Sequence, residues 1–162
     1  MFTDDQLAQV EAVLEACRKE GLRLAVAESC TGGLVAGCLT AVAGSSDVVE
    51  RGFVVYTNEA KMELLGVPAA LLETVGAVSE EVARAMAEGA LKQSNAQISV
   101  AVTGIAGPGG GTEEKPVGLV HIAAARDGAE TLLESHVFDG GRDAVRMQSV
   151  AAALALVRCR VG

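Results

Sequence analysis

The sequence predicts a single α/β domain over residues 1–162, arranged as three layers in which helices flank a mixed β-sheet. Helical periodicity and short apolar, strand-like runs alternate along the chain, which is typical of α/β proteins. Near the C-terminus, Asp127-Gly128 separates two apolar runs and predicts an antiparallel hairpin. No repeat, linker or low-complexity tail divides the chain, so we expect one domain.

Caps and turn residues predict where the first elements begin and end. Thr3 and Gln6 have the spacing of a capping box, so a helix is expected to begin there and to end at Gly21. A buried strand over 22–27 and a helix rich in small residues over 34–42 follow.

The later elements are predicted by the same signals, namely capping residues, helix-ending glycines and apolar runs. In order they are a strand over 53–56, a helix capped by Thr57 or Asn58 and ending at Gly66, a short helix from Pro68 to about Thr74, a helix capped by Ser79, strands over 98–102, 117–125 and 131–138, and a last helix over 141–159.

Composition excludes several classes of partner. The net charge of -8 repels phosphate backbones, and an aromatic content of only 2% leaves few stacking platforms, so nucleic-acid binding is not expected. Polar residues, glycines or charges interrupt every long apolar stretch, so no membrane span is expected.

The first residues lack the basic and apolar regions of a signal peptide, and we expect a cytoplasmic protein. A homo-oligomer is left open.

The four cysteines are not spaced as a metal or redox motif. They are expected to be buried, reduced thiols, namely Cys17, Cys30, Cys38 and Cys159. Only two histidines are present, His121 and His136, and both fall in the predicted hairpin strands. We therefore expect no metal site and no cofactor.

Three polar segments follow predicted strands directly, over 28–33, 57–61 and 103–111. Ligands of open α/β sheets bind beyond the carboxyl ends of the strands, so these segments are expected to form one pocket. Ser29 lies at the first of these turns, where its hydroxyl is either an exposed nucleophile or a helix cap. Cys30 is the rival nucleophile, since a helix N-terminus lowers the pKa of a thiol.

A serine nucleophile without a nearby histidine needs another base, and Lys61 is the best candidate. Lysine acts as a base only when burial or neighbouring cations keep it neutral. Tyr56 has the right spacing to orient Lys61 or relay a proton to it. The alternatives are a solvated helix lysine and a core tyrosine at the end of a strand.

The glycine-rich loop over 104–111 can turn its N–H groups toward an anion. Lys115 follows this loop, and Arg142 and Arg146 share one face of the last helix. These side chains are candidates for binding a phosphate. The alternatives are a flexible surface loop and a solvated arginine face.

Five short motifs occur along the chain in the same order as in a known protein family. They are AESCTGG (27–33), YTNEAK (56–61), GAVS (76–79), TGIAGP (103–108) and EKPVG (114–118). Through these motifs and their order, the stretch from about Gly21 to Arg146 closely resembles the CinA C-terminal domain family. Thr57 stands where serine is common in the family. Full-length members add a molybdopterin-binding-like domain, and the nucleotide pyrophosphatase activity associated with it is not expected here.

The resemblance implies hydrolysis of nicotinamide mononucleotide to nicotinic acid mononucleotide and ammonia, in pyridine nucleotide salvage. It matches Ser29 to the family's nucleophile, Lys61 to its lysine and Tyr56 to its tyrosine. The small-molecule substrate is expected to contact the turn after the first strand, the glycine-rich loop and the basic side chains, namely Cys30, Thr31, Gly32, Thr103, Gly104, Gly107, Lys115, Arg142 and Arg146. Two other functions stay open, a non-catalytic module linked to competence or DNA damage and an amidase for another phosphorylated amide.

Overall fold

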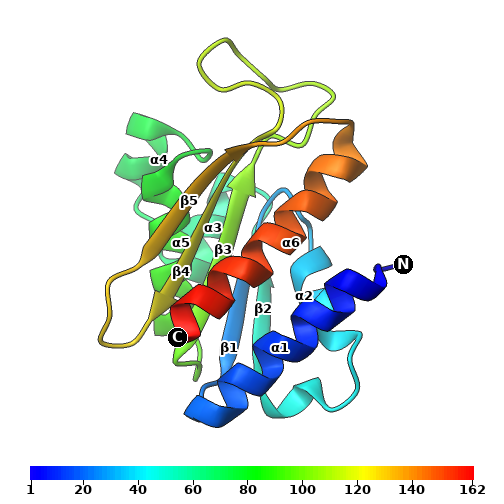
Figure 1. The fold of residues 1–162 in the computed structure, drawn as a ribbon. Coiled ribbons are helices and arrows are strands. Elements are labelled where there is room, and N and C mark those ends of the chain that lie inside the picture. Colours follow the sequence, from blue (N-terminus) through cyan, green and yellow to red (C-terminus); the bar gives the residue numbers. More distant parts are fainter.

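The computed structural model describes residues 1–162, and a five-stranded mixed sheet lies at its centre (Figure 1). Its strand order is β2-β1-β3-β4-β5. β1 pairs parallel with β2 and with β3, whereas β4 pairs antiparallel with both β3 and β5. The strands are β1 (Leu24–Glu28), β2 (Val49–Val54), β3 (Ile98–Gly104), β4 (Leu119–Arg126) and β5 (Leu132–Val137). The predicted mixed sheet and its C-terminal hairpin are therefore confirmed.

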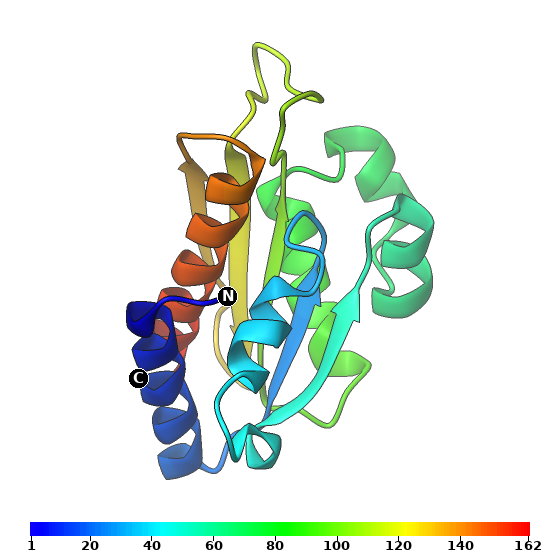
Figure 2. The same cartoon turned by 90° about the vertical axis from the view of Figure 1, so that its right-hand side faces the viewer.

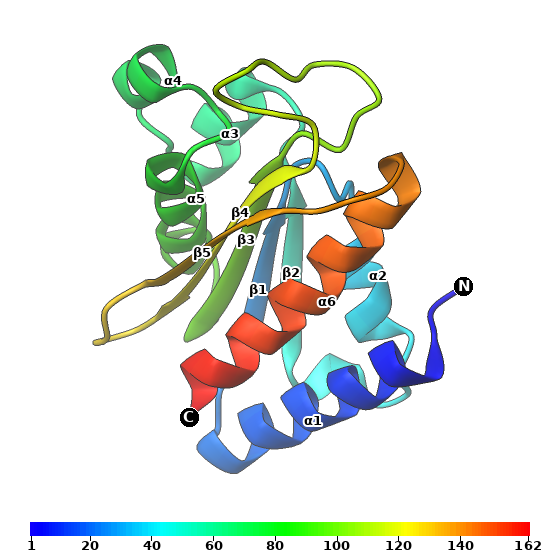
Figure 3. The ribbon, with the colours of Figure 1, turned by 45° about the horizontal axis from the view of Figure 1, so that its top comes forward.

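Helices cover both faces of the sheet, which confirms the three predicted layers. Helices α1, α2 and α6 pack on one face and α3, α4 and α5 on the other (Figures 2 and 3). Their bounds are α1 (Asp4–Glu20), α2 (Leu34–Thr40), α3 (Asn58–Leu65), α4 (Ala69–Val75), α5 (Glu80–Lys92) and α6 (Arg142–Val161), with a short 3-10 turn at Ser45–Asp47. None of these helices combines the length and the apolar composition that crossing a membrane requires.

Successive side chains of the central strands point to opposite faces of the sheet and so belong to two separate apolar cores. Leu24 and Val26 of β1 belong to the core under α1, α2 and α6, while Ala25 and Ala27 belong to the core under α5. The second core is built largely from alanine, which lets helices come close to one another and to the sheet. At Gly89 of α5, for example, an added Cβ would lie 2.1 Å from the carbonyl oxygen of Leu65 in α3.

The local signals predicted the element boundaries closely, with one clear exception. Thr3 and Gln6 form the predicted capping box, and α1 ends at Gly21 in the left-handed conformation. The second strand, predicted over 53–56, in fact covers Val49–Val54. β2 is an edge strand whose residues are exposed or half-buried, so it lacks the apolar run by which buried strands are recognised.

Candidate active site

A cavity of about 310 Å³ opens at the carboxyl ends of the parallel strands. Its wall includes Ser29 and Cys30 after β1, Lys61 in the first half of α3, Thr103 at the end of β3 and the following loop over 104–110. The three polar segments that follow β1, β2 and β3 are thus brought together, as predicted. Parallel pairing explains this, because β1, β2 and β3 all end at the same edge of the sheet.

Ser29 and Lys61 are in direct contact at the bottom of this cavity. The Lys61 Nζ donates hydrogen bonds to Ser29 Oγ at 3.0 Å and to the Val55 carbonyl oxygen at 2.8 Å. Lys61 is only 2% exposed and Ser29 only 9%. No carboxylate pairs with the amine, and burial lowers the pKa of Lys61. A neutral amine in this position is able to accept the hydroxyl proton of Ser29.

The residue at which α3 begins determines that the Lys61 side chain faces the sheet. Thr57 is the N-cap, and its hydroxyl accepts a hydrogen bond from the Ala60 N–H at 3.1 Å. This cap fixes the first helical turn, so that the side chain of Lys61 faces inward beneath the end of β1. The choice left between Thr57 and Asn58 as the cap is thereby decided in favour of Thr57.

The turn that carries Ser29 is held by a buried carboxylate that the sequence analysis overlooked. Helix α2 begins after Gly33, which has no side chain to cap it. Instead, Glu28 accepts hydrogen bonds from the N–H groups of Val35 at 2.8 Å and Ala36 at 3.0 Å. Val35 and Ala36 are the second and third residues of the helix, and an N-cap side chain normally accepts from one of these two N–H groups. The signal available in the sequence was an acidic residue ending an apolar strand just before a glycine-started helix.

Cys30 lines the cavity, but its environment does not activate it. Burial raises the pKa of its thiol to about 11, so the expectation of a lowered thiol pKa was wrong. Desolvation of this side chain, which is 6% exposed, outweighs the lowering effect of the Arg146 guanidinium. Of the other thiols, Cys17 and Cys38 are buried as expected, whereas Cys159 is exposed. Both histidines lie in the β4–β5 hairpin, where His121 contacts Ser135 and His136 contacts Glu134, and neither is hydrogen-bonded to Cys30.

Tyr56 is placed differently from the expectation. The residue is 59% exposed, and its hydroxyl accepts a hydrogen bond from Arg142 Nη2 at 2.9 Å. Arg142 Nη1 also donates to the Gly107 carbonyl oxygen at 2.7 Å. Tyr56 therefore has no hydrogen bond to Lys61 with which to orient it or relay a proton. Together with Arg142 it forms part of the cavity wall instead.

The other predicted binding residues divide into two groups. Gly104, Gly107 and Arg142 line the cavity, as does Thr103, whose hydroxyl donates to the Ala77 carbonyl oxygen at 2.8 Å. The remaining four do not line it, and three of them have their polar groups engaged within the protein. Lys115 donates to the Val75 carbonyl oxygen at 2.6 Å, and Arg146 donates to the carbonyl oxygens of Cys30 and Thr31. The Gly32 N–H donates to the Ser29 carbonyl oxygen. The fourth residue, Thr31, is fully buried.

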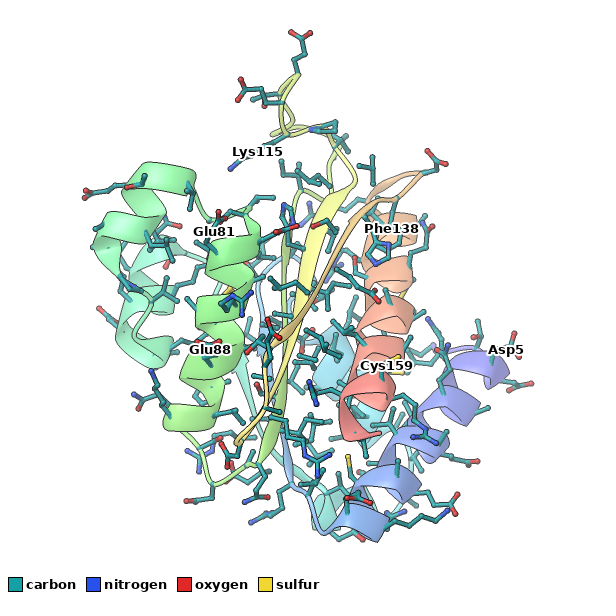
Figure 4. All side chains as sticks on the ribbon, turned by 60° about the vertical axis from the view of Figure 1, so that its left-hand side comes forward. Asp5, Glu81, Glu88, Lys115, Phe138 and Cys159 are labelled. Carbon is teal, nitrogen blue, oxygen red and sulfur yellow. The ribbon has the colours of Figure 1, made fainter.

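Figure 4 shows Lys115 at the base of the projecting loop, reaching toward the layer of α4 and α5. It ties that loop to the end of α4 rather than pointing at the cavity. The sequence could not reveal this, because spacing alone does not show to which side of a loop a lysine turns.

The cavity wall carries positive charge in an acidic protein. No Asp or Glu lines the cavity, whereas the Arg142 guanidinium does and supplies its positive charge. The N–H groups of Ala106 and Gly107 in the glycine-rich loop donate to no other group of the chain. No three His, Cys, Asp or Glu side chains gather closely enough to hold a metal ion. The wall is therefore suited to an anionic organic ligand.

Comparison with known proteins finds relatives over nearly the whole chain. A CinA-like protein of Synechococcus sp. (strain RCC307) is 53% identical over 98% of this chain and 38% of its own length. A CinA-like protein of Geobacter sulfurreducens is 53% identical over 93% of this chain and 36% of its own. The chain thus spans less than two-fifths of the length of these curated relatives.

Solved structures agree with the sequence relatives. The competence/damage inducible protein CihA of Agrobacterium tumefaciens superposes with a TM-score of 0.93 at 49% identity, covering 96% of this chain and 95% of the other. A CinA superfamily protein of Escherichia coli gives a TM-score of 0.90 at 36% identity, covering 96% and 91%. Residues 6–161 match the family described as CinA C-terminal domain. Since fold, sequence and motif order all agree over this span, the chain belongs to the CinA C-terminal domain family.

Proposed function

We propose that the protein hydrolyses the carboxamide of nicotinamide mononucleotide, releasing ammonia and nicotinic acid mononucleotide. One observation carries the proposal: the buried Lys61 amine lies 3.0 Å from the Ser29 hydroxyl and has no carboxylate partner. A serine–lysine pair of this kind is suited to amide hydrolysis, because the neutral amine activates a hydroxyl that is otherwise a weak nucleophile.

The proposed reaction proceeds through an acyl-enzyme. Ser29 Oγ attacks the carboxamide carbon while Lys61 takes its proton, and a tetrahedral oxyanion forms. The Cys30 N–H, which has no partner within the chain, is available to stabilise that oxyanion. Lys61 then returns the proton to the departing nitrogen, so that ammonia leaves. Water then attacks the ester while Lys61 accepts its proton, and Lys61 passes that proton to the departing Ser29 Oγ, which frees the acid and restores the Ser29 hydroxyl.

The substrate class follows from the charge and size of the cavity. A volume of about 310 Å³ falls within the usual range for small-molecule sites. Arg142 and the N–H groups of the glycine-rich loop line the cavity and are our candidates to hold the phosphate. The positive pyridinium ring of the substrate makes its own carboxamide more electrophilic, so neither a metal nor a cofactor enters these steps. Such a substrate places the reaction in cytoplasmic pyridine nucleotide salvage.

Ammonia release from a panel of amides tests the proposal. The panel contains nicotinamide mononucleotide, nicotinamide riboside, nicotinamide and phosphorylated amides that lack a pyridine ring. We expect selective release from the mononucleotide. Release from a different phosphorylated amide would support the alternative amidase. No release from any amide would support a non-catalytic module.

Variants of the site test the assignment of roles. Ser29→Ala is expected to lower kcat on the order of a thousandfold or more, while losing only about 1 kcal/mol of stability with its hydrogen bond. Lys61→Arg is expected to be equally inactive, because a guanidinium does not become neutral near physiological pH. Cys30→Ala is expected to retain most activity, since its backbone N–H remains.

The controls are thermal melts of all three variants. A folded Ser29→Ala protein with near-normal turnover would end the serine mechanism. If Cys30→Ala is folded but inactive while Ser29→Ala is active, the Cys30 thiol is the nucleophile.

A further inference from the structure

Arg142 and Arg146 lie one helical turn apart on α6 but reach different targets. Arg142 extends to the cavity wall, where it meets Tyr56 and Gly107. Arg146 is half-buried and lies behind the turn that carries Ser29. Its Nε donates to the Cys30 carbonyl oxygen at 3.1 Å, and its Nη2 donates to the Thr31 carbonyl oxygen at 3.2 Å. Only the first arginine is placed to meet a ligand.

Peptide planarity shows what these two contacts accomplish. In a trans peptide unit the carbonyl and the following N–H point in opposite directions, so fixing one fixes the other. The Ser29 carbonyl accepts from the Gly32 N–H at 3.0 Å, which orients the Cys30 N–H on the other side of that unit. The Cys30 carbonyl has Arg146 as its only donor. Both peptide units that flank Cys30 are therefore held. Arg146 alone holds the Cys30–Thr31 unit. Together with the Leu34 N–H it also holds the Thr31 carbonyl, whose peptide unit carries the Gly32 N–H that fixes the Ser29 carbonyl.

The guanidinium fits this task because of its shape. Two N–H groups on one planar edge reach two successive carbonyls at once, which a lysine amine is poorly shaped to do. The backbone turn is also shaped around the guanidinium. Gly32 has a φ of +56°, and a Cβ at this position would lie only 3.2 Å from Arg146 Nη2. A side chain at Gly32 would therefore crowd the guanidinium and would also be strained by the positive φ.

We propose that Arg146 is a positioning residue that holds the backbone after Ser29, so that the Ser29 hydroxyl stays aligned with Lys61 and the Cys30 N–H stays free for the oxyanion. This inference rests on the function proposed above. It assigns no substrate contact to Arg146. Its removal is expected to leave ground-state binding intact and to misplace the reacting groups.

The experiment compares Arg146→Lys and Arg146→Ala with wild type. Arg158→Lys, on the same helix but bonded only to the C-terminal Gly162, is the matched control. We measure kcat and KM for nicotinamide mononucleotide, and the rate at which a fluorophosphonate labels Ser29, followed by intact mass. We expect kcat to fall on the order of 10- to 100-fold in both Arg146 variants, with little change in KM. The labelling rate should fall in parallel, and Arg158→Lys should behave as wild type.

A contrast with Arg142 separates positioning from phosphate binding. Arg142→Ala is expected to raise KM for the mononucleotide and to change turnover of the riboside little. If Arg146→Ala showed that pattern instead, Arg146 would be a phosphate ligand and the proposal would be wrong. Unchanged kcat per folded molecule in Arg146→Lys would also overturn it, since the guanidinium fork would then be dispensable. If Arg146→Ala does not fold, Arg146→Lys alone decides.

The labelling assay also separates this proposal from the proposed function. Fluorophosphonate capture needs an activated Ser29 but no particular amide. If wild type labels rapidly yet releases no ammonia from the mononucleotide, the substrate is wrong, and slower labelling of the Arg146 variants still supports positioning. If wild type does not label, Ser29 is not activated and both proposals fail.

Discussion

At the scale of single residues, Lys61 has the least ordinary environment in the chain. Lysine is seldom buried, because transferring its charged form out of water is costly. Here the amine is almost completely enclosed, with one hydroxyl and one carbonyl as its hydrogen-bond partners. Burial therefore favours the neutral form and lowers the pKa of Lys61 below its ordinary value of 10.5.

This shift predicts the pH dependence of turnover. Below its pKa the Lys61 amine is protonated and is not able to accept the Ser29 proton, so kcat should rise with pH and level off once the amine is neutral. The lowered pKa places the midpoint of this rise below 10.5. The measurement is kcat for nicotinamide mononucleotide at saturating substrate across a pH series. A kcat that falls instead of rising as the pH is increased, in protein that stays folded, would contradict a lysine base.

Residue type predicted which residues meet at the cavity better than it predicted where their side chains point. Ser29 and Lys61 were singled out because their types and positions after strands suit a nucleophile and its base, and the structure places them in contact. Tyr56, Lys115 and Arg146 were singled out in the same way, yet their polar groups are engaged elsewhere. Which way a long side chain turns depends on tertiary neighbours that local sequence does not specify.

At the scale of elements, α2 depends on a capping group from outside itself. The helix has only seven residues and begins at a glycine, so it has little intrinsic stability. The Glu28 carboxylate supplies the missing cap across seven to eight residues of chain. The same contact connects the end of β1 to the start of α2 and so closes the turn around Ser29.

Glu28→Gln is therefore expected to destabilise the protein by about 1–2 kcal/mol, because the amide keeps one acceptor oxygen and loses the charge that favours a helix N-terminus. Glu28→Ala is expected to cost more, since two N–H groups lose their acceptor. Urea denaturation gives the free energy of unfolding. Glu73→Gln, on an exposed face of α4, is the control and should change it little. Equal stability of Glu28→Gln and wild type would mean that the carboxylate is not the effective cap.

Elements were predictable where their signals are local. Caps, helix-ending glycines and the Asp127-Gly128 turn act within a few residues, and the structure places the corresponding boundaries close to those predicted. The edge strand β2 was misplaced because its neighbour in the sheet, not its own composition, defines it. Glu28 was missed for the same reason, since its partners lie in the next element.

The two faces of the sheet are packed differently. The face under α1, α2 and α6 carries larger side chains such as Val100 and Val102 of β3, while the face under α5 carries alanines such as Ala101. A hydrogen bond from the Ser99 hydroxyl to the Ala87 carbonyl, at 2.6 Å, marks how closely α5 approaches β3. The α5 face has little room for a larger side chain.

Ala101→Leu is expected to destabilise the fold by about 1–3 kcal/mol, since overpacking forces α5 away from the sheet. The measurement is the free energy of unfolding from denaturant titration. Ala70→Leu, at an exposed position of α4, adds the same carbons without the confinement and serves as the control. A variant at Ala101 as stable as the control would show that this face tolerates added volume.

The hairpin turn at Asp127-Gly128 has a practical consequence. The Asp127 N–H donates to the carbonyl oxygen of Gln97, just before β3 begins, whereas the cavity lies where β3 ends. The turn is also exposed. A peptide tag or dye inserted there would sit at the far pole of the molecule from the Ser29 hydroxyl. Protein immobilised on an electrode or bead through this turn would present its open cavity to the flowing solution, so that a dissolved ligand would reach Ser29 without obstruction by the support.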